Sequence, residues 1–214
     1  FNEDCIMIEN VLIIGSGAIG TALVNSYLNL SNIQRVHWVS SSENEESDRL
    51  KTYQIQYNDE STYEPIVNQI SLHASLDVII IATGILHDQK VTPEKSLKEV
   101  EKDAFLHILT VNAVTPALLA KHFIHLLRRD SRSVLAFLSA RVGSISDNRL
   151  GGWYAYRASK AALNMVIKNI AIEEVRVNKK IIVVGLHPGT VDSPLSKPFQ
   201  SRIPKNSLFT PMQS

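Results

Sequence analysis

Short apolar runs alternate with longer helical stretches along most of this chain. Strands are predicted at residues 11–14, 36–39, 77–82, 134–138 and 181–186, with a weaker one at 54–57. Helices are predicted at residues 18–30, 102–129 and 153–175. Continuous apolar runs are typical of parallel strands that are buried on both faces. We therefore expect an α/β fold, a doubly wound parallel sheet of the Rossmann type with three layers, α/β/α.

The chain has 214 residues, and we expect residues 1–214 to form a single domain. No internal repeat, low-complexity tract or linker divides it. Residues 194–214 are rich in proline and show little periodicity, so we expect a mobile flap there.

Composition narrows the class of protein. The hydrophobic content is 44%, the charged content 20% and the net charge +1, which gives no reason to expect a nucleic acid or an anionic membrane as partner. Cys5 is the single cysteine, so no internal disulfide can form. No apolar run approaches membrane-spanning length and no signal peptide is recognised, so a cytoplasmic location is expected. The histidines lack the spacing of a metal site, and none is expected.

A glycine-rich loop follows the first predicted strand. The segment Gly15-Ser16-Gly17-Ala18-Ile19-Gly20 then leads into a helix. Between a strand and a helix, the pattern Gly-x-Gly-x-x-Gly indicates dinucleotide binding. Glycines allow a tight turn and a close approach of the backbone to a pyrophosphate, which binds at the helix N-terminus. A turn that merely connects strand and helix is the alternative. The context favours dinucleotide binding.

The end of the second strand bears on the choice of dinucleotide. An acid there would bind the ribose 2′-hydroxyl of NAD, whereas this chain has Ser40 and two more serines, with Glu43 further on. Hydroxyls accommodate a 2′-phosphate that an acid would repel. The sequence therefore favours NADP slightly, with NAD as the alternative.

Tyr156 and Lys160 are four residues apart in a predicted helix and lie on one face of it. An ammonium close to a phenol favours the phenolate, so we expect a lowered Tyr156 pKa. Such a phenol can exchange a proton with a carbonyl or alcohol oxygen. Taken alone, an exposed lysine beside a packed tyrosine would be the simpler interpretation, but the glycine loop favours the catalytic one.

A proline interrupts the long predicted helix near Asn112. Pro116 has no N–H for the carbonyl four residues earlier, which belongs to Asn112. We expect a kink at this point and a freed carbonyl oxygen. A tolerated proline without a function is the alternative.

Taken together, these motifs resemble the short-chain dehydrogenase/reductase superfamily, from Val11 to about Ser193, and most closely its C-factor-like subgroup. The resemblance implies that Tyr156, Lys160, Asn112 and a serine are catalytic. It implies a cofactor site formed by Gly15, Ser16, Gly17, Ile19, Gly20, Ser40, Asp59, Ala82, Thr83, Gly84, Tyr156, Lys160, Pro188, Gly189, Val191 and Ser193. Asp59 is expected to meet the adenine, and the carbonyl of Asn112 to hold a water in a proton relay.

Three departures from the family pattern stand out. The glycine loop is one residue short, and Ala82 replaces the asparagine of Asn-Ala-Gly. Ala140 occupies the position of the catalytic serine, so Ser139 or Ser144 would have to replace it, or the site would work without a serine. In the resemblance, the chain also ends before the family's last strand.

The resemblance implies a carbonyl reductase or alcohol dehydrogenase that takes a small-molecule carbonyl or alcohol substrate and forms a homodimer or homotetramer. Two alternatives stay open. One is a dinucleotide-binding regulatory or signalling protein with little turnover, and the other is an isomerase or dehydratase built on the same cofactor site.

Overall fold

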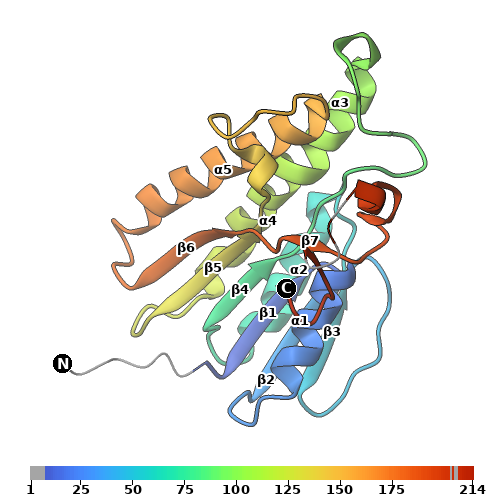
Figure 1. The fold of residues 1–214 in the computed structure, drawn as a ribbon. Coiled ribbons are helices and arrows are strands. Elements are labelled where there is room, and N and C mark those ends of the chain that lie inside the picture. The colour runs from blue at the N-terminus through green and yellow to red at the C-terminus, as the bar shows by residue number, and fades with distance from the viewer. Residues whose placement is uncertain (1–7, 203, 205–206) are drawn as a thin grey trace, which may run out of the picture.

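Six parallel strands form the central sheet of the protein (Figure 1). A computed structural model describes residues 8–202, 204 and 207–214, so Cys5 lies outside the described residues. The strand order is β3-β2-β1-β4-β5-β6. The strands are β1 (Asn10–Ile14), β2 (Arg35–Ser40), β3 (Leu50–Gln54), β4 (Val78–Ile81), β5 (Ser133–Leu138) and β6 (Ile181–Leu186). The order reverses between β1 and β4, which creates the crevice where ligands bind in doubly wound folds.

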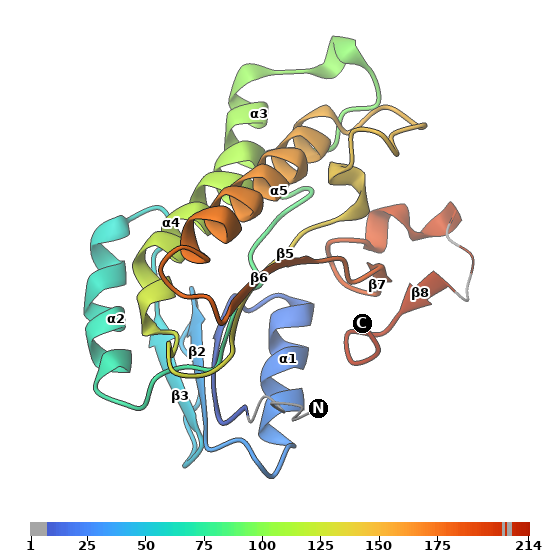
Figure 2. The same cartoon turned by 90° about the vertical axis from the view of Figure 1, so that its left-hand side faces the viewer.

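Helices cover both faces of this sheet, as Figure 2 shows. The α-helices are α1 (Ala18–Leu28), α2 (Tyr63–Ser71), α3 (Lys102–Leu109), α4 (Thr115–Phe123) and α5 (Tyr154–Glu174). Helix α1 lies on one face, and α2, α4 and α5 lie on the other. The predicted three-layer Rossmann architecture is therefore confirmed.

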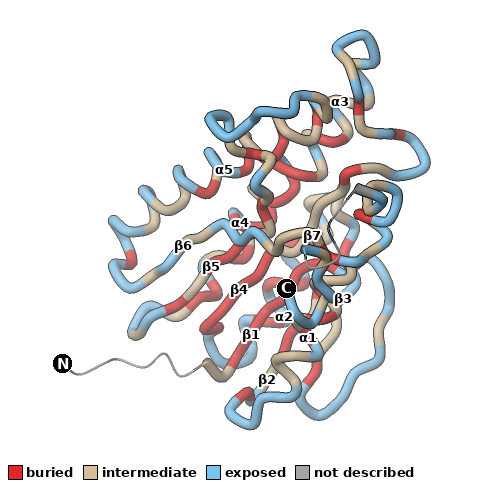
Figure 3. The backbone as a smooth tube through the Cα atoms, in the orientation of Figure 1, coloured by how far each residue is buried: buried red, intermediate tan, exposed pale blue. Residues whose placement is uncertain are grey.

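Apolar residues along the central strands alternate between two cores. Leu12 and Ile14 pack with residues of α2, α4 and α5, whereas Val11 and Ile13 pack with Val24 of α1. All five residues of β1 are buried, and the central strands are the most deeply buried backbone in Figure 3. Burial on both faces explains why these strands are continuously apolar rather than alternating.

Two predicted boundaries were wrong. The third strand is Leu50–Gln54, not 54–57, because β3 is an edge strand whose Lys51 and Thr52 are only half-buried and give no apolar run. The long helix ends in a 3₁₀ turn, Ile124–Leu126, before the predicted end at Arg129. Arg128 instead lies beside the buried Asp77, at the amino ends of the strands.

The helical stretch Lys102–Leu126 would be long and apolar enough to cross a membrane by length and composition alone, contrary to the sequence-based expectation. Leu119, Ala120 and Phe123 of this stretch are buried in the core shared with α2 and the sheet. Packing in the core thus accounts for these three residues, whereas Leu106 and Val114 of the same stretch are exposed.

An irregular turn interrupts this stretch where the proline predicted a kink. Thr110–Val114 form a π-helical turn in which the N–H of Thr115 donates to the carbonyl of Thr110. Single π turns of this kind are frequent at functional sites. The helix is therefore irregular directly before Pro116, while the kink and the freed carbonyl of Asn112 stay predictions.

The segment after β6 contains a short strand β7 (Thr190–Val191), a 3₁₀ helix η6 (Lys197–Arg202) and a strand β8 (Leu208–Phe209). β7 and β8 pair in parallel as a small second sheet. The mobility expected for residues 194–214 stays a prediction.

Asp77 joins three segments at the amino end of the sheet. Its Oδ2 accepts hydrogen bonds from the backbone N–H groups of Glu9 and Asn10 at 2.8 and 2.9 Å. Nε of Arg128 lies 2.8 Å from Oδ1, an ion-pair distance without hydrogen-bond alignment. The carboxylate is fully buried, and breaking a buried pair leaves an uncompensated charge.

We predict that Asp77→Asn lowers the free energy of unfolding by about 3 kcal/mol, because Arg128 loses its counter-charge. Urea denaturation followed by circular dichroism measures this change. Asp48→Asn, at an exposed position, serves as the matched control and should leave the midpoint unchanged. An unchanged midpoint in Asp77→Asn would contradict the structural role.

His37 is fully buried on β2. Its Nδ1 lies 2.9 Å from the hydroxyl of Tyr53, and its Nε2 has no partner among the described residues. Burial, reinforced by the nearby His73 and Arg35, lowers the pKa of the His37 ring to about 4. The folded protein therefore holds this imidazole neutral.

This pKa predicts a loss of stability in acid. The unfolded imidazole has a pKa of about 6.5, so the unfolded chain binds more protons between pH 6.5 and 4. The His37 contribution should be complete above pH 6.5 and fall by about 3 kcal/mol as the pH approaches 4. Urea midpoints between pH 7 and 4 should fall less steeply in His37→Leu than in the wild type. His125→Leu, at an exposed position, should keep the wild-type slope, and equal slopes in all three proteins would refute the assignment.

Candidate active site

The glycine loop is held against the end of β4 by direct backbone contact. Gly15 has a φ of 128°, and a Cβ built on it would lie 2.8 Å from the carbonyl oxygen of Ala82. A Cβ on Gly20 would lie 2.3 Å from the carbonyl oxygen of Gly15. Neither site has room for a side chain, so these two glycines fix the turn between β1 and α1.

Gly17 is different, because a Cβ built there would find no atom within 4 Å. It is the N-cap of α1, with no side-chain cap and no acid in the first helical turn. The adjacent Ser16 is exposed, and Ile19 is half-buried in α1. Free N–H groups and the positive end of the helix dipole thus face open space, which is where a pyrophosphate would fit.

Ser40, at the end of β2, is fully buried and already bonded within its own turn. Its hydroxyl donates to the carbonyl of Ser42 at 2.6 Å and accepts from the amide of Asn44 at 2.7 Å. Ser41 and Ser42 are exposed beside it. The hydroxyl of Ser40 therefore shapes the turn, while the neighbouring serines are the ones open to a ligand.

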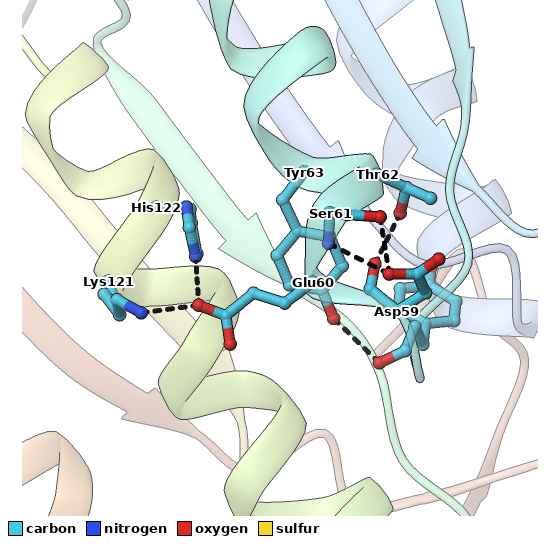
Figure 4. Close-up of polar contacts among 8 residues, drawn as sticks. Asp59, Glu60, Ser61, Thr62, Tyr63, Lys121 and His122 are labelled. Carbon is cyan, nitrogen blue, oxygen red and sulfur yellow. Dashed lines mark hydrogen bonds and ion pairs between the residues drawn. The ribbon is translucent and has the colours of Figure 1, made fainter.

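Asp59 lies on the turn that leads into α2, and Figure 4 shows its contacts. Its carboxylate accepts from the backbone N–H of Ser61 at 3.0 Å and from the Ser61 hydroxyl at 2.6 Å. The neighbouring Glu60 bonds His122 of α4 at 2.6 Å. Asp59 therefore caps its own turn, and its contact with an adenine stays a prediction.

Asn112 and Gly84 meet next to helix α5. Asn112 is fully buried in the π turn, where its side chain accepts from the N–H of Ile85 and donates to its carbonyl, both at 2.8 Å. Its amide also donates to the hydroxyl of Ser159 on α5 at 3.0 Å. The loop Ala82-Thr83-Gly84 is thereby tied to both helices.

Lys160 reaches the same point from α5. A Cβ on Gly84 would lie 3.1 Å from Nζ of Lys160 and 3.3 Å from Oδ1 of Asn112. Nζ donates to the carbonyl of Leu138, at the end of β5, at 2.9 Å. Burial lowers the pKa of the Lys160 ammonium to about 8. The sequence prediction that these residues form one cluster agrees with this geometry.

Tyr156 lies one turn before Lys160, whose Nζ is 5.9 Å from the centre of the tyrosine ring. Burial raises the pKa of the Tyr156 hydroxyl to about 12. The expected lowering of this pKa is therefore wrong for the protein without a cofactor, because Lys160 is hydrogen-bonded to Leu138 and does not offset the desolvation of the phenol. No hydrogen bond engages the Tyr156 hydroxyl in the part of the chain that the structure describes.

Ser139 faces away from this cluster, along α5. Its hydroxyl donates to Oδ1 of Asn164, two turns beyond Tyr156, at 2.5 Å. Ser139 and Ser144 share a cavity of about 350 Å³ with Arg141, Asn164 and His187. Ser144 is half-buried and 3.5 Å from the hydroxyl of Ser146. The hydroxyl of Ser139 is thus occupied by Asn164, and the assistance of Tyr156 by Ser139 or Ser144 stays a prediction.

The loop after β6 runs through Pro188 and Gly189 into β7. Gly189 has a φ of 75°, and a Cβ there would lie 2.9 Å from the ring of Phe209. Val191 is buried, and the backbone carbonyl of Ser193 accepts from the N–H of Ser196 at 3.1 Å. This loop is therefore a defined structure at the carboxyl end of the sheet, although its contact with a nicotinamide stays a prediction.

One residue near Tyr156, Glu94, escaped the sequence reasoning. The buried carboxylate of Glu94 accepts from the N–H of Ala155 at 3.2 Å, and its backbone carbonyl accepts from the N–H of Trp153 at 2.6 Å. Glu94 thus caps α5 from a distant loop, since α5 has no cap of its own. The contact spans 61 positions, and no local signal could have revealed it.

Comparison with known proteins places this geometry in a family. Residues 9–203 match the family model described as short chain dehydrogenase. C-signal of Myxococcus xanthus is 33% identical over 103 residues, which cover 48% of this chain and 61% of that protein. The chain therefore spans less than two thirds of this relative's length.

Solved structures agree on the fold. The carbonyl reductase Sniffer of D. melanogaster superposes with a TM-score of 0.76 at 25% identity, over 87% of this chain and 83% of that one. The NADPH-bound carbonyl reductase from chicken fatty liver gives a TM-score of 0.82 at 20% identity, over 97% and 84%. The match to C-signal also agrees with the predicted C-factor-like subgroup. With its Rossmann sheet, its glycine loop and its Tyr-x-x-x-Lys helix, the chain belongs to the short-chain dehydrogenase family.

Proposed function

We propose that the protein is an NADP-dependent oxidoreductase that transfers hydride between a nicotinamide and a small carbonyl or alcohol substrate, with NAD as the alternative cofactor. The observation that carries this proposal is the position of Lys160, bonded to the end of β5 and next to Gly84. It lies one turn from Tyr156, whose hydroxyl has no partner among the described residues. A proton donor thus stands at the crevice where the glycine loop lies.

The residues available for the cofactor lie along the carboxyl edge of the sheet. The α1 N-terminus at Gly17 would hold the pyrophosphate, and the exposed Ser41 and Ser42 would receive a 2′-phosphate. Gly84 and the loop from Pro188 to Ser193 would border the nicotinamide. The bound nicotinamide would supply the hydride or accept it. The structurally similar carbonyl reductase from chicken fatty liver binds NADPH, which supports NADP as the cofactor here.

Tyr156 would give its proton to the substrate oxygen. A phenol whose pKa is near 12 stays protonated at neutral pH, which suits a donor in carbonyl reduction. Lys160 and the carbonyl of Asn112 would replace this proton from solvent. Ser144, or Ser139 after releasing Asn164, would donate a hydrogen bond to the developing oxyanion.

A regulatory protein with little turnover is the second candidate. Ala140 at the usual serine position and the commitment of Ser139 to Asn164 favour it, as does the name of the relative C-signal. An isomerase or dehydratase has no specific observation in its favour. The buried Asn112 and the Tyr156-Lys160 pair favour the oxidoreductase, because cofactor binding alone does not need a proton donor and its relay.

We also propose a cytoplasmic location and a homodimer or homotetramer. Apolar side chains are exposed on the outer faces of the helices that follow β4 and β5. They are Leu106, Val114, Met165 and Ile172. A second copy packed against these faces would cover them.

We predict that Tyr156→Phe lowers kcat at least about 100-fold, because the substrate oxygen loses its proton donor. Oxidation of NADPH, followed by absorbance with a panel of aldehydes and ketones, measures kcat. Binding of NADPH, followed by fluorescence, should stay within about twofold of the wild type. Tyr154→Phe on the exposed side of α5 is the matched control. Full activity in Tyr156→Phe would refute the mechanism, and tight NADPH binding without turnover in the wild type would favour the regulatory candidate.

The open space at Gly17 gives a second test. We predict that Gly17→Asp keeps or improves stability, since aspartate is a good N-cap, but raises the Kd for NADPH at least about tenfold by repelling the pyrophosphate. The neutral Gly17→Asn separates charge from bulk and should weaken binding less. Equal NADPH affinity in Gly17→Asp and the wild type would show that the cofactor binds elsewhere.

A further inference from the structure

Three aromatic rings from three segments pack in series, and the first of them contacts the Tyr156 ring. The ring centres of Trp153 and Tyr156 are 6.1 Å apart, with an interplanar angle of 74°. Trp153 and Phe199 of η6 are 5.2 Å apart at 64°, and Phe199 and His87 are 5.7 Å apart at 66°. All are edge-to-face contacts, the geometry that aromatic quadrupoles prefer. We call Trp153, Phe199 and His87 the aromatic wall.

The wall is held in place by polar contacts of the Trp153 backbone and of the His87 ring. Glu94 accepts the backbone N–H of Trp153 and caps the next residues of α5. Nε2 of His87 lies 3.1 Å from the carbonyl oxygen of Leu195, which ties the loop after β4 to the segment before η6. The rings themselves are half-buried, so each keeps part of its surface open.

The backbone of Trp153 adds an independent sign of function. Its φ of 51° and ψ of 47° are left-handed, and no other non-glycine residue in the described ranges has a positive φ. Gly151 and Gly152 before it have φ values of 63° and 64°. A bulky side chain in this conformation costs on the order of 1–2 kcal/mol, and such strain concentrates at ligand sites. The turn thus presents a tryptophan where a glycine would be less costly.

The wall restricts what the proposed active site can accept. A carbonyl oxygen bonded to the Tyr156 hydroxyl must lie about 2.7 Å from it. Because the ring centres of Tyr156 and Trp153 are 6.1 Å apart, a substituent on that carbonyl can reach the Trp153 ring, against which Phe199 packs. These two rings offer no charge to that substituent, and their edges and faces suit another flat ring.

Resting on the proposed function, we propose that Trp153 and Phe199 determine specificity and select a carbonyl substrate that carries an aryl ring or another flat apolar group. A charged or polyhydroxylated chain at this position would lose its hydration without a partner. The wall therefore assigns a substrate class to the site.

Two ketones of similar size and different flatness test this proposal. Acetophenone carries a phenyl ring, and cyclohexyl methyl ketone carries the saturated ring in its place. We expect kcat/KM with NADPH to favour acetophenone at least about fivefold after correction for their rates with borohydride. Phe199→Leu and Trp153→Leu should each reduce this preference about three- to tenfold, the worth of one aromatic pair. Trp153→Phe should retain most of it.

Tyr154→Leu removes an exposed ring from the same helix and should keep the wild-type preference. Turnover of both ketones without an aromatic preference would overturn the specificity and leave the oxidoreductase intact. If neither ketone is turned over, ligand-observed NMR titration of the NADPH-saturated protein measures the binding of each ketone and tests the aromatic preference without turnover. Tighter binding of acetophenone that is lost in Phe199→Leu would support the aromatic wall, and equal binding of both ketones would overturn it.

Discussion

The junction between α5 and the carboxyl end of β5 is the constraint on which the site depends. Lys160 donates to the carbonyl of Leu138 at 2.9 Å, and Gly143 lies so close that a Cβ would be 2.7 Å from the carbonyl carbon of Lys160. The long side chain of Lys160 and the absence of a side chain at Gly143 thus allow α5 to pack closely on the end of β5. This contact places Tyr156, one turn earlier, above the edge of the sheet. The hydroxyl of Ser159 accepts a hydrogen bond from the side-chain amide of Asn112.

This junction also governs the electrostatics of the site. A buried ammonium that is bonded to a neutral carbonyl remains poorly compensated, so its pKa falls to about 8, while the pKa of the phenol beside it rises to about 12. Desolvation therefore acts on both groups in the direction of the neutral form. The sequence suggested a pair in which one charge acidifies the other. The structure instead holds two groups that each resist ionisation.

The sequence predicts the parts of the fold in which local pattern and tertiary environment agree. The run from Val11 to Ile14 is apolar because both sheet faces are covered, and Pro116 necessarily disturbs the helix ladder. Edge strand β3 was misplaced because Lys51 and Thr52 give it no apolar run. At the site, motif spacing brought Tyr156, Lys160 and Asn112 together. Glu94 and the aromatic wall depend on contacts between distant segments, which no local pattern encodes.

The π turn at Thr110–Val114 has a consequence for the phase of the whole helical stretch. One extra residue in a turn rotates everything that follows by about 100° around the axis. The residues before the turn and those after it therefore present different sides of the helix to their neighbours. Asn112 can point at α5 while Leu119 and Phe123 still face the sheet. A single-residue deletion here would remove this rotation and uncouple Asn112 from either the core or α5.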